Sequence, residues 1–225
     1  MEKKMEHCKV KNMYDLTQTL AAPLLETVDY PWEALPKIGE FIKEIGPKLD
    51  PEVFERRGEN IWIAKSVSIA ATATLNGPLI IDEDTEVRPG AFIRGNVIVG
   101  KNCVVGNSTE LKNVILFNVV QVPHYNYVGD SILGFKAHMG AGSITSNVKS
   151  DKKLITIKGP DCNIDTGIKK IGAFLGDNVE VGCGSVLNPG TIVGRESNIY
   201  PLSSVRGFIP AGSIYKKQGE VVTKR

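Results

Sequence analysis

From residue 61 onward, aliphatic residues recur at every sixth position of the chain. The residue after each of them is often small or polar, as at Ala64, Asn76 and Gly100. An α-helix has 3.6 residues per turn and a strand alternates every two, so neither gives a period of six. A hexapeptide β-helix does, because each six-residue segment makes one short strand and one turn. The aliphatic positions are Ile63, Ile69, Leu75, Ile81, Val87, Ile93, Val99, Val105, Leu111, Leu175, Val181, Leu187, Val193, Ile199 and Val205. We therefore predict a mainly β protein with one inward aliphatic residue per segment.

The segment 1–60 follows a helical pattern instead. Leu16, Leu20 and Leu24 are four residues apart, and a second apolar stripe with three- and four-residue steps runs over residues 35–45. Prolines interrupt both stretches. We expect two or three short helices that cap one end of the repeat body, a cover that solenoids need for solubility. A separate binding function for this segment is the alternative.

The repeat is interrupted twice. Leu111 and Leu133 are 22 residues apart, two fewer than four six-residue segments would take. Phe117 or a close neighbour is the expected inward position after Leu111. A polar, lysine-rich stretch then predicts a loop over residues 148–170 that leaves the coil and returns to it. Long loops on a rigid scaffold are frequent sites of function, so we expect chemistry near this loop.

Composition and charge exclude several classes of protein. The chain has 27 basic and 25 acidic residues among 225, so neither nucleic acid nor a membrane surface is expected as its partner. No apolar run approaches the length of a membrane span, and the N-terminus has no signal-peptide core. The four cysteines lack paired spacing, so we expect reduced thiols and a cytoplasmic protein.

We expect three parts in the chain. They are a helical N-terminal segment (1–60), a β-helix (61–216) and a solvated basic tail (217–225). The first part has no glycine-rich loop with an arginine, so nucleotidyl transfer is not expected of it.

The stretch over residues 106–147 holds two of the three histidines and several polar residues at fixed spacings. The first group of motif residues is Gly106, Asn107, Glu110 and Lys112. The second group is His124, Tyr127, Gly129 and Asp130. The third group is Gly140, Ala141, Gly142, Ile144, Thr145 and Asn147.

With these motifs, the repeat resembles the hexapeptide-repeat acyltransferases, which form a left-handed parallel β-helix. Residues 61–216 look like the acetyltransferase half of the bifunctional enzyme that makes UDP-N-acetylglucosamine, and like related domains of sugar nucleotidyltransferases. The resemblance implies three segments per coil, so that every third segment stacks on the same face, and a homotrimer with sites between neighbouring β-helices. It also implies acetyl-coenzyme A as co-substrate, an amino sugar phosphate or sugar nucleotide as acceptor, and no metal.

The resemblance further implies roles for several of these residues and for some residues outside the stretch. His124 matches the base that takes a proton from the attacking amine, and Glu110 matches a carboxylate that orients it. The positions that match the substrate site are Arg94, Lys112, Tyr127, His138, Asn147 and Lys153. The positions that match the coenzyme groove are Ala141, Cys183, Pro201 and Lys216. We prefer Arg94 to Arg88 because it lies one full coil of three segments before Lys112.

Departures from the family pattern leave alternatives open. His138 stands where the amino-sugar enzyme has asparagine, and Cys183 where it has serine, so the acceptor and the activity are undecided. The alternative is a non-catalytic β-helix, a sugar-nucleotide-binding or scaffold protein related to UDP-N-acetylglucosamine pyrophosphorylase. A zinc site like that of gamma-class carbonic anhydrases needs three histidines from neighbouring coils, and the repeat body has two.

Overall fold

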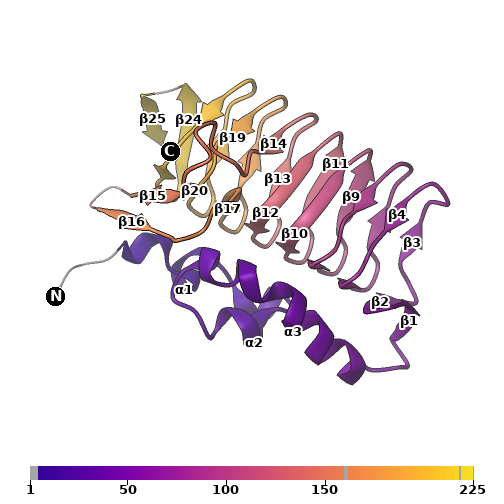
Figure 1. Cartoon of the computed structure of the whole chain (residues 1–225). Helices are drawn as coiled ribbons and strands as arrows, with labels where there is room; N and C mark the ends of the chain where they lie inside the picture. Colours follow the sequence, from indigo (N-terminus) through magenta and orange to yellow (C-terminus); the bar gives the residue numbers. More distant parts are fainter. Residues whose placement is uncertain (1–4, 160–161, 218, 225) are drawn as a thin grey trace.

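A computed structural model describes residues 5–159, 162–217 and 219–224 of the chain. They form a parallel β-helix with a helical segment along one side (Figure 1). Successive coils pair in parallel, and each full coil places a short strand on each of three faces. None of the helices in these residues is long and apolar enough to span a bilayer.

The three faces are named in the order in which the chain first visits them. The first face contains β2 (Ile61–Ala64), β5 (Leu79–Ile81), β8 (Val97–Val99), the second halves of β10 (Glu110–Leu116) and β12 (Tyr127–Leu133), β17 (Ala173–Leu175), β20 (Thr191–Val193) and β23 (Phe208–Ile209). The second face contains β3 (Ser68–Ile69), β6 (Glu86–Val87), β9 (Val104–Asn107), β11 (Gln121–His124), β13 (His138–Met139), β18 (Glu180–Val181), β21 (Asn198–Ile199) and β24 (Ser213–Lys217). The third face contains β4 (Thr74–Leu75), β7 (Phe92–Ile93), the first halves of β10 and β12, β14 (Ile144–Thr145), β19 (Val186–Leu187) and β22 (Ser204–Val205).

The six-residue repeat corresponds to the axial core. Ile63 pairs with Ile81, and Ile81 pairs with Val99, so each regular coil takes up three segments of the repeat. The predicted repeat positions are almost fully buried, except Ile69 and Leu75 near the start of the β-helix, which are partly buried. One aliphatic side chain per segment therefore fills the interior, as the sequence predicts.

The first interruption is a change of coil length. Val99 pairs with Leu116, and Leu116 pairs with Leu133, so each of these coils is one residue shorter than a regular one. Leu116, the immediate neighbour of Phe117, therefore holds the inward position, which lies within the range that the sequence predicts. Phe117 is also buried, but its ring packs against Tyr14 of the helical segment, with ring centroids 5.1 Å apart.

The shortened segments also change the edge between the third and first faces. With one residue fewer in the turn, β10 and β12 run continuously from one face to the next. Asn113 and Asp130 occupy the bend with φ of 56° and 48°. This left-handed conformation is tolerated best by glycine, asparagine and aspartate.

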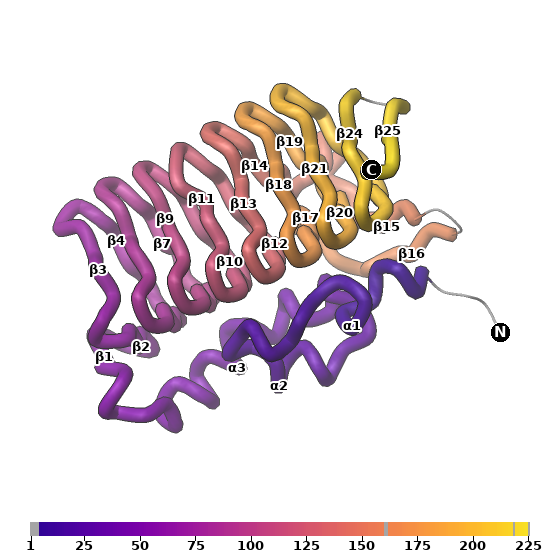
Figure 2. Tube along the Cα trace, turned by 180° about the vertical axis from the view of Figure 1, so that it is seen from behind, coloured from indigo at the N-terminus to yellow at the C-terminus, as the bar shows by residue number. Residues whose placement is uncertain are grey.

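The helical segment covers the first face and not an end of the β-helix (Figures 1 and 2). Its α-helices are α1 (Val10–Met13), α2 (Ala22–Leu25) and α3 (Ile38–Ile45). Its 3₁₀ helices are η1 (Glu6–Cys8), η2 (Leu16–Gln18), η3 (Pro31–Glu33), η4 (Leu35–Lys37) and η5 (Gly46–Lys48). The outward side chains of the first face are completely buried at Ile80, Ile98, Ile115, Ile132, Phe174 and Ile192. The expected end cap is therefore wrong, because this face is apolar on both sides of its strands and needs a cover of its own.

Asp177 links the helical segment to the β-helix. Its buried carboxylate accepts hydrogen bonds from the backbone amides of Asp15 and Phe135, both at 2.8 Å. Arg195 Nη2 lies 2.9 Å from the same carboxylate. Burial raises the pKa of Asp177, and these donors oppose that rise.

Hairpins form at both ends and in the inserted loop. β1 (Phe54–Gly58) pairs antiparallel with β2, and β25 (Glu220–Thr223) pairs antiparallel with β24. The expected tail over residues 217–225 thus contains a strand on the last coil, whose residues are mostly exposed. The segment over residues 148–170 carries a third hairpin, β15 (Thr156–Lys158) with β16 (Asn163–Asp165), beside the last coils.

Candidate functional site

The edge between the second and third faces carries His124 and three of the predicted coenzyme positions. The Gly142 amide donates to the His124 carbonyl at 3.0 Å, and the amides of Gly184 and Leu202 make equivalent bonds on the next coils, both at 2.9 Å. One residue per coil is thus stacked along the edge, and all of these residues are exposed. This corner row consists of His124, Ala141, Cys183 and Pro201.

The backbone that carries His124 is held rigidly. The side chain of Asn126 is buried, accepts from the His124 amide at 3.1 Å and donates to the Gly140 carbonyl at 2.9 Å. A Cβ on Gly106 would lie 1.6 Å from the Pro123 carbonyl oxygen, so only glycine permits this close approach of neighbouring coils. An exposed imidazole on a fixed backbone is positioned to meet a ligand that lies along the corner row.

The turn over residues 140–142 offers fewer free amides than its glycines suggest. The Gly140 amide donates to the Val181 carbonyl at 2.7 Å, and the Gly142 amide to that of His124. Among the described residues, the Ala141 amide alone of the three has no acceptor. It is the one backbone donor of this turn that can bond a ligand without breaking a coil contact.

A second group of predicted residues meets at the edge between the third and first faces. Lys112 Nζ lies 2.9 and 3.2 Å from the two carboxylate oxygens of Asp130. Asn113 Nδ2 donates to the same carboxylate at 3.0 Å, and Asn147 Nδ2 at 2.6 Å. Asn147 Nδ2 also donates to the Tyr127 hydroxyl at 3.1 Å. These five residues form the Asp130 cluster.

Asp130 is the functional candidate that sequence reasoning did not assign. Its side chain is 4% exposed, whereas that of Lys112 is 26% exposed, so the carboxylate lies beneath the lysine. Part of the signal was present, because Asp130 belongs to the motif stretch, but the shortened coil pairs Lys112 with Gly129 and brings Asp130 to the bend beside it. Burial raises the pKa of Tyr127, with neighbouring Asp130 and Glu110 adding to the effect, so its hydroxyl keeps a proton to donate.

Glu110 is paired with Arg94 and not with His124. Arg94 Nη1 lies 2.7 Å from the Glu110 carboxylate, and this hydrogen bond raises the pKa of the guanidinium. Phe92 pairs with Glu110, so Arg94 lies one coil below Lys112, as its spacing in the sequence predicts. No hydrogen bond joins Glu110 to His124, because the two lie on different faces of neighbouring coils. The expected carboxylate–imidazole contact is not formed within the described chain.

The remaining predicted residues lie apart from both groups. His138 Nδ1 is 2.8 Å from Glu180 Oε2 on the second face. Lys153 is an exposed residue of the inserted loop, and Lys216 on β24 lies 3.4 Å from Glu220. No three His, Cys, Asp or Glu side chains within residues 5–159, 162–217 and 219–224 are placed to hold a metal ion.

The corner row and the Asp130 cluster border the same face. His124 ends β11, and Tyr127 begins β12 three residues later, so the width of one narrow face separates the two groups. A ligand across the third face therefore meets the imidazole at one end. At the other it meets the Tyr127 hydroxyl, Lys112 and Asn147. This arrangement suits an amine acceptor that is held by its polar groups while its nitrogen points toward the imidazole.

Comparison with known families gives a match over most of the β-helix. Residues 75–193, more than half of the chain, match the family described as the GMPPB C-terminal domain. The chain is 34% identical over 207 residues to a protein named bifunctional protein GlmU from Methanococcus maripaludis strain C5, covering 88% of this chain and 49% of that protein. It thus spans about half the length of its relatives from Methanococcus maripaludis and Methanococcus vannielii.

A shorter relative is matched over nearly its whole length. The chain is 27% identical over 222 residues to the putative uncharacterized acetyltransferase YaiX of Escherichia coli K12, covering 90% of this chain and 94% of that one. Among solved structures, the polySia-specific acetyltransferase NeuO superposes with a TM-score of 0.50 at 17% identity, over 70% of this chain and 80% of that one. At that identity the likeness concerns the fold alone, and the predicted left-handed parallel β-helix is confirmed.

Proposed function

Because the chain belongs to the family of the GMPPB C-terminal domain, we propose that it is an N-acetyltransferase of the hexapeptide-repeat class. It moves an acetyl group from acetyl-coenzyme A to the amine of a sugar phosphate or sugar nucleotide. Relatives named GlmU, YaiX and a bifunctional sugar-1-phosphate nucleotidylyltransferase/acetyltransferase support this reaction class. The observation that carries the proposal is an exposed histidine on a rigid corner row, one face away from the Asp130 cluster.

In this mechanism the corner row holds the coenzyme. The pantetheine arm lies along Ala141, Cys183 and Pro201, where small or short side chains leave the edge open. The Ala141 amide, which has no acceptor among the described residues, donates to the thioester carbonyl oxygen. This donor stabilises the negative charge that develops on that oxygen during attack.

The Asp130 cluster holds the acceptor. Asp130 fixes Lys112 and Asn147, and Asn147 in turn bonds the Tyr127 hydroxyl. Since that hydroxyl accepts from Asn147, its own proton is free for a sugar oxygen. The acceptor nitrogen attacks the thioester carbon and forms a C–N bond while the C–S bond breaks. His124 takes the proton from nitrogen and returns it to the leaving thiolate.

The assembly we propose is a homotrimer in the cytoplasm. The helical segment occupies the first face, so subunits meet through the second and third faces or the edge between them. That edge exposes Tyr125 at 65% and Leu202 at 85%, both with positive φ. Apolar side chains with this much exposure support a contact surface at that edge. Light scattering is expected to give three times the chain mass, and a monomer would contradict the shared site.

The experiment that tests the function is coenzyme A release from acetyl-coenzyme A, measured by thiol titration across amino sugar phosphates and nucleotide-linked amino sugars. One acceptor is expected to give release, and His124→Ala to reduce it by about a thousandfold while the coenzyme still binds. His7→Ala is the matched control, because His7 lies on η1, outside both residue groups, and should not change the rate.

A non-catalytic sugar-nucleotide-binding protein is the second candidate. The observation that favours it is the Arg94–Glu110 pair, which leaves the His124 ring without a carboxylate partner in the described chain. If His124→Ala releases coenzyme A at the same rate as the wild type, His124 is not the base. If the wild-type protein binds a sugar nucleotide but releases no coenzyme A with any acceptor, this second function is established.

A further inference from the structure

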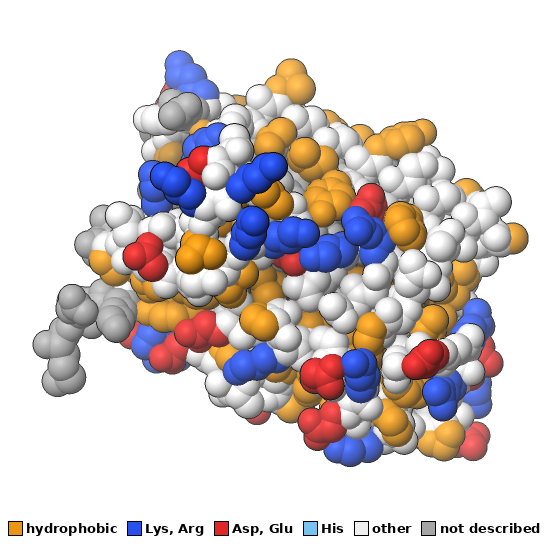
Figure 3. Space-filling model, viewed as in Figure 1, with side chains coloured by type: hydrophobic (Ala, Val, Ile, Leu, Met, Phe, Trp, Pro, Cys, Tyr) orange, Lys and Arg blue, Asp and Glu red, His pale blue; other side chains and the backbone are white. Residues whose placement is uncertain are grey.

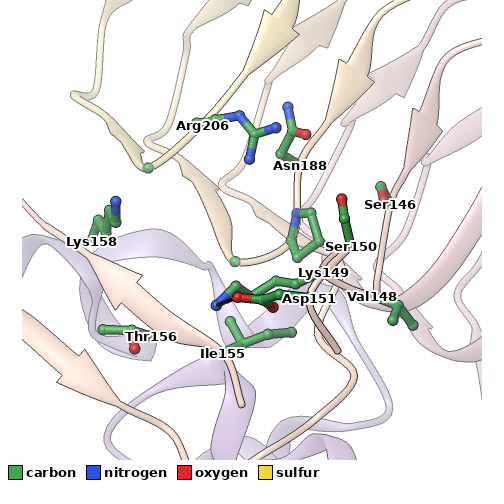
Figure 4. A pocket seen from close by; sticks show the side chains of 13 residues that line it. Ser146, Val148, Lys149, Ser150, Asp151, Ile155, Thr156, Lys158, Asn188 and Arg206 are labelled. Carbon is green, nitrogen blue, oxygen red and sulfur yellow. Dashed lines mark ion pairs between the residues drawn. The ribbon is translucent and has the colours of Figure 1, made fainter. Parts of the chain in front are cut away.

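A cavity lies between the inserted segment and the β-helix. No residue of the corner row or of the Asp130 cluster lines it. Its volume is about 440 Å³, within the range of small-molecule sites. Residues 148–158 form one wall, and the edge between the third and first faces forms the other (Figure 4). Asn188 and Arg206 project from that edge, opposite Lys149 and Asp151 of the insertion.

The cavity carries an excess of positive charge. Arg206, Lys158 and Lys149 line it, and Asp151 is its one acidic residue. Lys149 is partly neutralised by Asp151, 3.4 Å away. In the described residues, neither Arg206 nor Lys158 has an ion pair or a side-chain hydrogen bond. Figure 3 shows further Lys and Arg side chains across the face that bears the insertion. Two unpaired cations on opposite walls attract a phosphate group.

Neutral groups in the cavity add hydrogen-bonding capacity beyond charge. Asn188 is 8% exposed, and its Nδ2 donates to the Val205 carbonyl at 2.9 Å and to Ser204 Oγ at 3.0 Å. Its side-chain oxygen accepts no hydrogen bond from the described residues, so it is free for an N–H or O–H of a ligand. The hydroxyls of Ser146 and Ser150 also line the cavity. A phosphate alone does not need these acceptors, whereas a nucleoside does.

The cavity continues the Asp130 cluster along the same edge. Asn147 of that cluster lies between Ser146 and Val148, both of which line the cavity. Ser146 stacks below Asn188, and Asn188 below Arg206, one coil per step. Since parallel strands are about 4.8 Å apart, Arg206 lies roughly 10 Å along the axis from the coil of Asn147. A sugar held by the cluster therefore has its anomeric substituent within reach of the cavity.

We propose that this cavity binds the nucleoside diphosphate portion of the acceptor, so the acceptor is a nucleotide-linked amino sugar and not a simple sugar phosphate. The inference rests on the proposed function and narrows its substrate class. Coenzyme A also carries a nucleoside diphosphate. Its proposed groove, the corner row, lies on the opposite edge of the third face from the cavity. The acceptor is therefore the source that the geometry favours.

The test is calorimetric titration of the full chain with UDP, GDP, dTDP and coenzyme A, without acetyl-coenzyme A present. At least one nucleoside diphosphate is expected to bind, and Arg206→Ala to weaken it about tenfold or more, as for a lost charged hydrogen bond. Affinity for coenzyme A should stay unchanged. Arg56→Ala is the matched control, since Arg56 on β1 lies at the other end of the β-helix.

Lys158→Ala, on the opposite wall, provides a second variant if Arg206→Ala fails to fold. The inference is overturned if no nucleoside diphosphate binds, or if both variants weaken coenzyme A instead. It is also overturned if the protein acetylates amino sugar 1-phosphates with a KM that neither variant changes. That result would leave the acetyltransferase function standing. If the protein shows no turnover but binds a nucleoside diphosphate through Arg206, the assignment of the cavity is supported and the proposed function fails.

Discussion

At the scale of single residues, we propose that Asp130 organises the acceptor side of the site. Its nearly buried carboxylate holds Lys112, Asn113 and Asn147 in one geometry. Lys112 is thereby a positioned donor whose charge is largely balanced, and Arg94 is balanced in the same way by Glu110. Arg206, which has no ion pair in the described residues, lies further along the edge, in the cavity behind the inserted loop.

Replacing Asp130 with asparagine keeps its shape and removes its charge. Asp130→Asn leaves Lys112 without its counter-ion, so the acceptor KM should rise about tenfold and unfolding stability should fall by about 2 kcal/mol. Steady-state kinetics and urea denaturation measure the two effects. Glu40→Gln is the control, because its side chain is 82% exposed and its pair with Lys43 contributes at most about 0.5 kcal/mol. A changed affinity for coenzyme A with an unchanged acceptor KM would contradict this assignment.

Some of these residue contacts follow from the sequence and others do not. The period of the coil predicts that Arg94 lies below Lys112. It does not predict that Asp130 meets Lys112, because the shortened coil pairs Lys112 with Gly129. The partner of Glu110 cannot be obtained this way, because the period fixes which coil a residue occupies but not where its side chain turns at an edge. Whether the Glu110 carboxylate pairs with Arg94 or with His124 depends on local side-chain geometry.

At the scale of elements, the sequence shows why one face needs a cover. The first face repeats apolar triplets such as 79–81 and 97–99, whereas the other faces mostly alternate apolar with polar residues. A triplet implies burial on both sides of its strand. The helical stripe over residues 35–45 likewise predicts that α3 packs on something, but its period does not identify the partner. Only the tertiary structure shows that the two apolar surfaces meet along the β-helix.

The cover should contribute directly to stability. Ile42 on α3 is completely buried, so Ile42→Ala should lower the free energy of unfolding by about 3 kcal/mol through lost burial and a residual cavity. Lys43→Ala, at the next position of the same helix, exposes no core and should change it by less than about 0.5 kcal/mol. Urea denaturation compares the two variants. Equal stability of both would show that the helices do not depend on this packing.

At the scale of the whole molecule, we propose that the β-helix holds two ligand sites along opposite edges of one narrow face. The repeat predicts the coil and its core, because a period of six allows few other structures. It does not predict the form of the long coil between Met139 and Val181, whose hairpin and cavity come from an insertion outside the period. Shortened coils place the Asp130 cluster, and the insertion places the cavity beyond it. Both departures from the repeat therefore lie where we propose that the acceptor binds.

The most direct measurement is mass spectrometry of acceptors incubated with the protein and acetyl-coenzyme A that carries an isotopic label in its acetyl group. Our account predicts that a nucleotide-linked amino sugar gains the labelled acetyl group on its nitrogen, as an amide stable to mild base. It predicts no such product with His124→Ala. Absence of any labelled product from wild-type protein that binds both ligands, or a base-labile ester in its place, would contradict N-acetyl transfer.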